Sequence, residues 1–292
     1  MHDRGARQRI VHESEEPITG VEFRADPRLT TLYVATTSRI LKLVISGRGQ
    51  GQPARVVEDS GCGVGCMTVD KNTGDIVVAR DDFISYYGSD GRGPYFAYDG
   101  PKSLMAIYED YVAVVSPPAT TSAAKSSTLR KFGGAQADDI FSTSTFTMVD
   151  PGMKIVAHSE SLVSQVKTMF MIWGDLFTLT QDGKVSSSEN SNLSRHSHST
   201  KIYRYHQKSL QQRLEILYQR NLFVYAINLA QKSGMDAPQQ NAIFRRYGDF
   251  LYQKADYDGA MQQYLKAIDN TEPSQVIRKA RVPPSPLKTI LT

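Results

Sequence analysis

Two cysteines in a glycine-rich loop are the first residues of this chain to weigh as a chemical site. Cys62 and Cys66 flank three residues in the run Gly-Cys-Gly-Val-Gly-Cys that starts at Gly61. A structural zinc site takes a complete set of Cys and His ligands, and neither a second cysteine pair nor a nearby histidine follows. The run also lacks the Lys-Ser/Thr of a nucleotide-binding P-loop. It predicts a turn between strands.

Histidines and acids offer further candidates, but none forms a complete catalytic set. His158 precedes Ser159 and Glu160, yet a serine nucleophile needs a strained elbow such as Gly-x-Ser-x-Gly, which is missing. His196 and His198 lie in a serine-rich stretch, where any metal binding would be weak and incidental. Two pairs of acids are expected to serve turns: Asp81-Asp82 and Asp138-Asp139. We therefore predict no enzyme, and no catalytic, cofactor-binding or metal-binding residue.

The single tryptophan of the chain has two possible roles. Trp173 ends the apolar run that begins at Met169. Such a run on a strand is usually part of a core, so we expect Trp173 to be buried. The alternative is that it marks a surface for a partner.

Composition limits the class of protein. The chain has 292 residues, a net charge of +4, 40% hydrophobic and 22% charged residues, which is ordinary globular usage. Two cysteines make no disulfide framework, no secretory segment opens the chain, and no apolar run approaches the ~20 residues of a membrane helix. Like charges form no long block, so we expect no nucleic-acid partner. A soluble protein of a reducing compartment is predicted.

Many short apolar runs, rich in Val, Ile, Tyr, Phe and Thr, predict β-strands between residues 18 and 185. Pairs such as Asp-Gly supply the tight turns between them. The expected strands are 19–24, 31–36, 40–45, 66–70, 75–80, 83–87, 95–98, 104–108, 111–116, 146–150, 154–158, 165–173 and 176–180. Hairpins that start at Leu32 and Ile76 are spaced by about one four-stranded blade. We predict a partial WD40-like β-propeller of about four blades, with a β-sandwich as the alternative.

Beyond residue 202 the apolar period becomes helical. Seven positions have the spacing of a tetratricopeptide repeat: Phe244, Tyr247, Gly248, Leu251, Ala260, Tyr264 and Ala267. The small residues at 248 and 260 let two antiparallel helices approach closely, and the aromatic residues fill the groove between them. We predict the start of an α-solenoid of the tetratricopeptide or clathrin-heavy-chain-repeat type, with a third helix over residues 275–281. The fold class is thus β followed by α.

Several stretches resemble the vacuolar protein sorting-associated protein 11 family, in a fungal version. They are Ser-Asp-Gly-Arg-Gly-Pro from Ser89, Trp-Gly-Asp-Leu-Phe-Thr-Leu-Thr from Trp173, Leu-Glu-Ile-Leu-Tyr-Gln-Arg-Asn from Leu214 and Glu-Pro-Ser-Gln-Val-Ile from Glu272. The resemblance covers residues 12–185 and 203–279. These motifs are too long for chance to be a good explanation.

The resemblance implies a non-catalytic scaffold, the shared core subunit of the HOPS and CORVET tethering complexes. Its role would be vesicle docking and fusion, and protein transport to the vacuole. Implied partners are the other class C vacuolar sorting core subunits and, indirectly, Rab GTPases and SNAREs. The implied place is cytoplasmic and peripheral on the late endosome or vacuole membrane, through the complex. A generic propeller–solenoid coat or transport-complex subunit is the alternative. Ligands for the family's RING-type zinc domain are missing.

The chain departs from the family pattern in three places. We expect an N-terminal tail at 1–17, the partial propeller at 18–185, a Ser/His-rich disordered insert at 186–202, the solenoid start at 203–279 and an aberrant tail at 280–292. The insert interrupts an expected join of Val185 to Tyr203, so we hypothesise a retained intron or a mispredicted exon. Family members have earlier blades and continue past residue 279. We therefore expect a truncated fragment that folds only marginally alone.

Overall fold

The computed structural model describes residues 10–27, 29–46, 51–118, 143–162, 164–181 and 200–267. The chain divides into two compact units, Met1–His206 and Gln207–Thr292. The first contains β-strands and the second contains α-helices. Several expectations fall outside the described residues: the third helix at 275–281, the tail at 280–292, and the residues Asp138, Asp139, His196 and His198.

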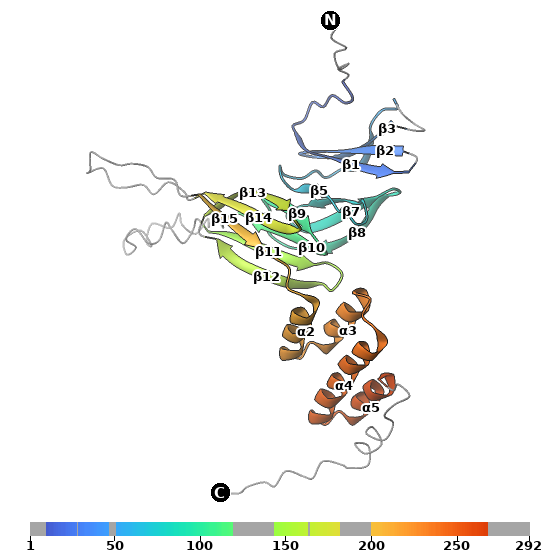
Figure 1. The fold of residues 1–292 in the computed structure, drawn as a ribbon. Helices are drawn as coiled ribbons and strands as arrows, with labels where there is room; N and C mark the ends of the chain where they lie inside the picture. The colour runs from blue at the N-terminus through green and yellow to red at the C-terminus, as the bar shows by residue number, and fades with distance from the viewer. Residues whose placement is uncertain are drawn as a thin grey trace, which may run out of the picture. The chain divides into compact units, whose positions relative to one another are not determined.

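The strand unit consists of four antiparallel sheets in chain order (Figure 1). The first sheet holds β1 (Ile18–Asp26), β2 (Leu29–Thr36), β3 (Ile40–Ser46) and β4 (Arg55–Glu58). The second holds β5 (Met67–Val69), β6 (Ile76–Ala79), β7 (Phe83–Gly88) and β8 (Gly91–Ala97). The third holds β9 (Leu104–Tyr108), β10 (Tyr111–Ser116), β11 (Ser144–Asp150) and β12 (Ile155–Leu162). The fourth holds β13 (Gln165–Ile172), β14 (Asp175–Gln181) and β15 (Thr200–Tyr205).

The sheets are blades of a β-propeller, because their first strands contact one another in series. β1 contacts β5, β5 contacts β9, and β9 contacts β13. A blade between two neighbours is covered on both faces, so successive residues of its middle strands can be buried rather than only alternate ones. All four residues of β6 are buried, as this arrangement requires. The predicted partial propeller of four blades is confirmed.

Two apolar clusters join successive blades. The first connects blades one to three through Tyr33, Ile76, Ile84 and Met105, among others. The second connects blades three and four, with Phe146 and Leu176 fully buried within it. Each cluster draws side chains from more than one sheet, so the blades stabilise one another and the burial of apolar surface is shared along the series.

Two strands differ from the sequence-based expectation. β4 was not predicted, because it is a short strand of two valines between charged residues and is only half-buried at best. β15 lies where we expected the end of the insert and the first residues of the solenoid. Thr200 pairs with Gln181 and Tyr205 pairs with Leu176, so these residues complete blade four. The boundary between the units follows His206, and the expected boundary at 202/203 is corrected accordingly.

The helical unit contains α2 (Leu210–Gln219), α3 (Phe223–Lys232), α4 (Ala237–Gln253) and α5 (Tyr257–Lys266). Ser209 and Gln212 form a capping box that satisfies backbone N–H groups at the start of α2. Asp236 and Asp256 are the N-caps of α4 and α5, where each carboxylate accepts a hydrogen bond from a backbone N–H of the first turn. Each helix contacts the next along the chain. These two helical hairpins form the predicted start of an α-solenoid.

Gly248 explains how α4 and α5 approach so closely. A Cβ atom at this position would lie 2.6 Å from Cε1 of Tyr264, so only glycine fits. The Tyr264 hydroxyl donates a hydrogen bond of 2.6 Å to Oδ1 of Asp249, which holds the ring against the glycine. The predicted role of position 248 is therefore confirmed. None of the described helices is long and apolar enough to cross a membrane.

Candidate functional site

The cysteine loop is a packing element. Cys62 and Cys66 are free and buried, and the Cys66 thiol donates to the carbonyl of Lys102 at 3.2 Å. Burial raises the pKa of Cys66 to about 12, so the thiol form is retained at neutral pH, whereas metal binding and nucleophilic attack need the thiolate. A Cβ atom on Gly61 would lie 2.0 Å from the Thr36 carbonyl oxygen. The glycine allows this close approach of two backbones.

The histidine and serine of β12 do not form a catalytic arrangement. His158 Nε2 lies 3.7 Å from Oε1 of Glu160, with both side chains partly exposed. Ser159 shares a hydrogen bond of 3.3 Å with Thr147, and Glu160 accepts one from the Tyr205 hydroxyl. These contacts hold β12 to its neighbours. No group of three or more His, Cys, Asp or Glu within the described ranges could hold a metal ion.

Two buried cations lie near the Asp81-Asp82 turn, and sequence reasoning missed both. The Arg80 guanidinium donates to the carbonyls of Gly61 and Ser60 at 3.0 and 2.7 Å, and to the hydroxyls of Ser85 and Tyr87 at 2.8 Å. A buried charge is costly unless its hydrogen bonds are satisfied, and this network satisfies them. The available signal was a charge directly after a fully apolar strand.

Lys102 repeats the arrangement at the next connection. Its Nζ donates to the carbonyls of Asp81 and Gly100 at 2.9 and 2.7 Å, and also to that of Tyr98. Burial lowers the pKa of Lys102, because the low-dielectric surroundings disfavour the charged form. The carbonyl groups bind the ammonium as a cage, so Lys102 fixes the connection between β8 and β9.

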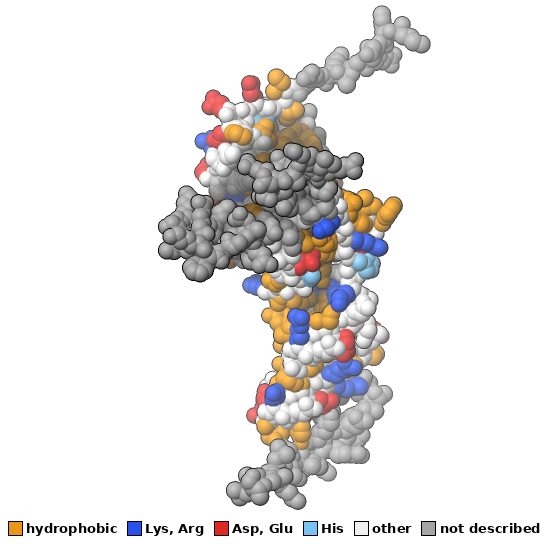
Figure 2. Space-filling model, turned by 90° about the vertical axis from the view of Figure 1, so that its left-hand side faces the viewer, with side chains coloured by type: hydrophobic (Ala, Val, Ile, Leu, Met, Phe, Trp, Pro, Cys, Tyr) orange, Lys and Arg blue, Asp and Glu red, His pale blue; other side chains and the backbone are white. Residues whose placement is uncertain are grey.

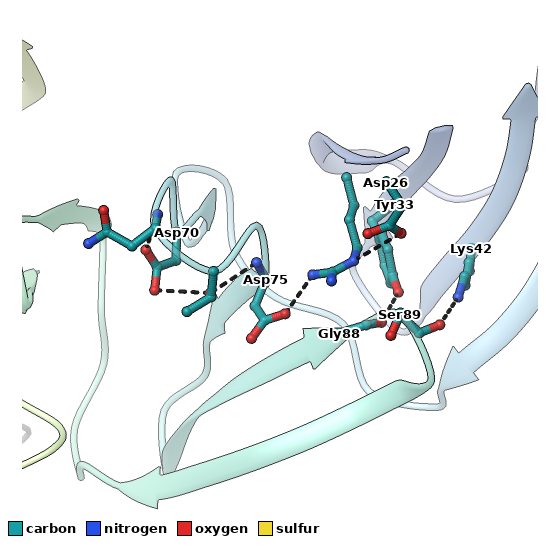
Figure 3. Close-up of polar contacts among 10 residues, drawn as sticks. Asp26, Tyr33, Lys42, Asp70, Asp75, Gly88 and Ser89 are labelled. Carbon is teal, nitrogen blue, oxygen red and sulfur yellow. Dashed lines mark hydrogen bonds and ion pairs between the residues drawn. The ribbon is translucent and has the colours of Figure 1, made fainter. Parts of the chain in front are cut away.

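Polar contacts tie blade one to blade two, and Figure 3 shows them in close-up. Arg24 on β1 forms an ion pair with Asp75 at 2.6 Å and a second one with Asp26 at 3.3 Å. Asp75 ends a turn that Asp70 organises by accepting the backbone N–H of Asn72 at 2.9 Å. Arg24 therefore links the first strand of one blade to a turn of the next.

A second pair of contacts in Figure 3 reaches the β7–β8 turn. The Tyr33 hydroxyl donates to the Gly88 carbonyl at 2.8 Å, and Lys42 Nζ donates to that of Ser89 at 2.6 Å. Burial raises the pKa of Tyr33 to about 12. These groups have hydrogen-bond partners on the neighbouring blade, so we assign them to blade assembly.

A polar cluster lies beside the turn of the β13–β14 hairpin. Asp175 is buried and accepts from Arg204 Nε at 2.6 Å and contacts His206 Nδ1 at 2.6 Å. The hydrogen bond with His206 is the main cause that lowers the pKa of Asp175, followed by Arg204. The side chains of both partners, Arg204 and His206, are exposed. Asp175 therefore remains ionised and joins the turn to β15.

Trp173 is not part of a core, and that expectation is wrong. Its side chain is 94% exposed, at the tip of the same hairpin. The backbone φ angle is 53° at Trp173 and 78° at Gly174. Two successive positive φ angles are typical of the two-residue type I′ turn that joins hairpin strands. In the run from Met169 the first residues are partly buried, while Met171 and Ile172, although paired with Leu176 and Asp175 of β14, are exposed at the end of the blade.

A groove of about 420 Å³ lies between α3, α4 and α5. Its lining combines apolar walls, side-chain amides and one cation: Val224, Ile227, Asn228, Gln231, Phe244, Tyr247, Gln263 and Lys266. Amide side chains can both donate to and accept from a peptide backbone. The groove has the chemistry for an extended peptide and lacks the paired titratable groups of a catalytic centre.

Charged side chains of both signs are scattered over the face drawn in Figure 2, among hydrophobic and neutral ones. No block of one sign stands out on the coloured part of that face. Nucleic acid is bound through concentrated positive charge, so this distribution gives no support to such a partner. Neither the blades nor the helices bring catalytic groups together in the described ranges.

The chain is similar in sequence to known proteins of one family. Residues 1–189 match a family model described as "PEP5/VPS11 N-terminal". A "Vacuolar protein sorting-associated protein 11 homolog" of Homo sapiens is 33% identical over 279 residues, which cover 95% of this chain and 27% of that protein. The corresponding homolog of Arabidopsis thaliana is 26% identical, over 94% of this chain and 26% of that protein. The chain thus spans about a quarter of the length of these relatives.

The homolog of Dictyostelium discoideum is 28% identical over 96% of this chain and 29% of its own length. Among solved structures, Kuenenia stuttgartiensis hydrazine synthase aligns over 61% of this chain and 48% of its own, with a TM-score of 0.43 and 9% identity. That likeness is too loose to carry an argument. The relatives named here are not fungal, so the expectation of a fungal version stays a prediction.

Proposed function

Because the chain belongs to the vacuolar protein sorting-associated protein 11 family, we propose that it is part of a non-catalytic scaffold subunit of a vacuolar sorting complex. The family-model match over residues 1–189 carries this proposal. It favours a sorting subunit over a generic propeller–solenoid coat or transport-complex subunit. The scaffold acts in vesicle docking and fusion and in protein transport to the vacuole.

The architecture supports a scaffold. Within the described residues, the blades and helical hairpins bring no catalytic set together, and charged groups such as Arg24 and Asp75 form contacts between blades. The groove of the helical unit offers amides and a lysine to an extended segment of a partner. Repeat architectures of this kind commonly serve as extended binding surfaces.

We propose as partners the other class C vacuolar sorting core subunits of the HOPS and CORVET complexes. Rab GTPases and SNAREs would be contacted indirectly, through those subunits. The protein would work from the cytoplasm, on the late endosome or vacuole membrane, with peripheral attachment through the complex. No cofactor or metal is part of the proposal.

Co-purification of the tagged chain, and of its longer relatives, with the class C subunits tests this function. We expect at least one of those subunits to be captured reproducibly at physiological salt. Two lysines allow a matched comparison, because Lys266 and Lys254 each lie over a phenylalanine ring, at 5.9 and 5.8 Å, but only Lys266 lines the groove. Lys266→Glu should weaken capture more than Lys254→Glu. If no class C subunit binds even a full-length relative, the proposed function is wrong.

A further inference from the structure

We propose that the tip of the β13–β14 hairpin inserts into the interfacial region of a lipid bilayer, with Trp173 as its anchor. This is a direct contact with lipid. It goes beyond the proposed function, in which partner subunits provide the attachment to the membrane. The two can be tested separately, because lipid binding by this chain needs no partner.

Three consecutive apolar side chains project from the end of the hairpin. Met171 is 39% exposed, Ile172 is 41% exposed and Trp173 is 94% exposed. Single exposed apolar residues are common on protein surfaces, whereas a contiguous group usually marks an interaction site. Tryptophan is enriched where membranes meet water, because the indole combines an apolar ring with a polar N–H group, and apolar neighbours such as Met171 and Ile172 add buried area when they enter lipid.

The arrangement of these side chains favours a bilayer over a groove on a protein. Successive residues of a strand point to opposite faces, so Met171 and Ile172 lie on the two sides of the hairpin. Trp173 follows them directly, in the turn, and is almost fully exposed. A protein groove of ordinary depth covers one face of a docked hairpin, whereas a lipid phase surrounds the inserted tip. An apolar cap on both faces therefore matches lipid.

The turn itself carries a residue that its geometry does not favour. Positive φ at both central positions selects Asn-Gly, Asp-Gly or Gly-Gly, because a bulky side chain at φ of 53° is unfavourable. Trp173 occupies the first of these positions and Gly174 the second. A conformation that costs energy and exposes an indole to water points to a use for that indole.

Charges beside the tip are compatible with phosphate headgroups. Asp175 follows the turn directly, and its carboxylate is already paired with Arg204 and His206. The side chains of Arg204 and His206 are 64% and 72% exposed. The Arg204 guanidinium beside the apolar tip is therefore open to solvent while it is paired with the buried carboxylate. Because one carboxylate offsets the arginine, we expect only a modest preference for anionic lipid.

Intrinsic fluorescence isolates this tip, because the chain contains one tryptophan. The full chain is titrated with vesicles of phosphatidylcholine, alone and with phosphatidylserine. We expect emission typical of exposed indole without lipid, a blue shift with both kinds of vesicle, and quenching by brominated lipid chains. Anionic lipid should tighten binding by only about twofold to tenfold. Unchanged emission with both vesicle types would overturn the proposal.

Three variants separate insertion from folding. Trp173→Asn removes the indole and installs the favoured Asn-Gly turn, so the hairpin is retained while co-flotation with vesicles falls by at least about tenfold. Ile172→Asp keeps the fluorophore and should abolish the blue shift. Val64→Asp alters another exposed apolar residue, 74% exposed between β4 and β5, and should leave flotation unchanged. Equal flotation of Trp173→Asn and the parent chain would refute insertion, as would a blue shift that class C subunits produce and vesicles do not.

Discussion

Deletion of residues 186–202 should leave blade four folded and make it more stable. The two residues before the deletion, Lys184 and Val185, have the same character as the last two deleted residues, Lys201 and Ile202. In the parent chain Lys201 pairs with Thr180 and Ile202 with the residue before it. After deletion Lys184 can pair with Thr180, and Val185 with Leu179. The strand opposite β14 then begins Lys-Val-Tyr instead of Lys-Ile-Tyr.

The register of the shortened hairpin follows from turn chemistry. Keeping Thr178 opposite Tyr203 leaves Gln181, Asp182 and Gly183 as a loop. A three-residue hairpin loop is built from a type I turn and a left-handed residue, usually glycine, which is the place of Gly183. A two-residue Asp-Gly turn would instead slip the register by one residue and move each side chain of β15 to the other face.

The expected gain comes from the loop, since the strand loses little. Thr200, Lys201 and Ile202 are exposed, whereas Tyr203 and Tyr205 are half-buried and are retained. The connection between β14 and β15 shrinks from residues 182–199 to three residues, and this roughly sixfold shortening lowers the entropic cost of bringing the two strands together by about 1.5 kcal/mol. We therefore expect the free energy of unfolding to rise by about 1–2 kcal/mol.

Urea unfolding followed by circular dichroism measures this change on the parent and shortened chains. Gly183→Ala in the shortened chain should cost about 1 kcal/mol, because it places a Cβ at a left-handed position. Register is read from cysteine pairs: Thr180→Cys should form a disulfide with Lys184→Cys rather than with Val185→Cys. A shortened chain that is less stable than its parent, or that forms the second disulfide, would refute the reasoning.

Other predictions concern packing and charge. Gly248→Ala should destabilise the helical unit by about 1–3 kcal/mol in thermal unfolding, because the new Cβ meets the Tyr264 ring, and an unchanged midpoint would contradict this. Arg80→Leu should lower the free energy of unfolding, measured in urea, by about 3 kcal/mol or more, because buried carbonyl and hydroxyl groups lose their donor. A free energy equal to that of the parent chain would contradict this and show that water replaces the guanidinium. The pKa values of Tyr33 and Cys66 are each raised to about 12 in the folded state. Between the ordinary pKa values of these groups and about pH 12, the unfolded chain therefore loses their protons while the folded chain keeps them. Stability should therefore fall as pH rises from about 9 to about 12, and a urea midpoint that is constant over this range would refute that sign.

The blade pattern was readable from sequence because apolar runs and turn residues alternate at short intervals. The expected strands at 104–108 and 111–116 coincide with β9 and β10, where a tight turn separates two buried runs. The helical hairpin was equally readable, because Gly248 and Ala260 mark the contact between α4 and α5. In these elements local residue preference and tertiary burial favour the same structure.

Strands that depend on a neighbour were harder to predict. β4 and β15 have no fully buried residue, and hydrogen bonds to β3 and β14 fix them in place. Period alone cannot distinguish such an edge strand from a loop, because its apolar content is low. The contacts of Arg80 and Lys102 are harder still, since their acceptors are mostly backbone carbonyls, which every residue possesses and no sequence pattern marks.

Trp173 shows how a correct pattern can lead to a wrong location. The run from Met169 to Trp173 is as apolar as a core strand, and its first four residues do belong to β13. The register with β14, however, sets Ile172 opposite Asp175 and leaves Trp173 and Gly174 for the turn. Registers are decided by pairing across strands, so the position of a turn within an apolar run is not encoded by the run itself. The decisive signal was Gly174 followed by Asp175, a turn glycine and a polar residue directly after the tryptophan. An apolar run that continues to such a pair has its last side chains at the end of the sheet and in the turn, where they are exposed and therefore available to another surface.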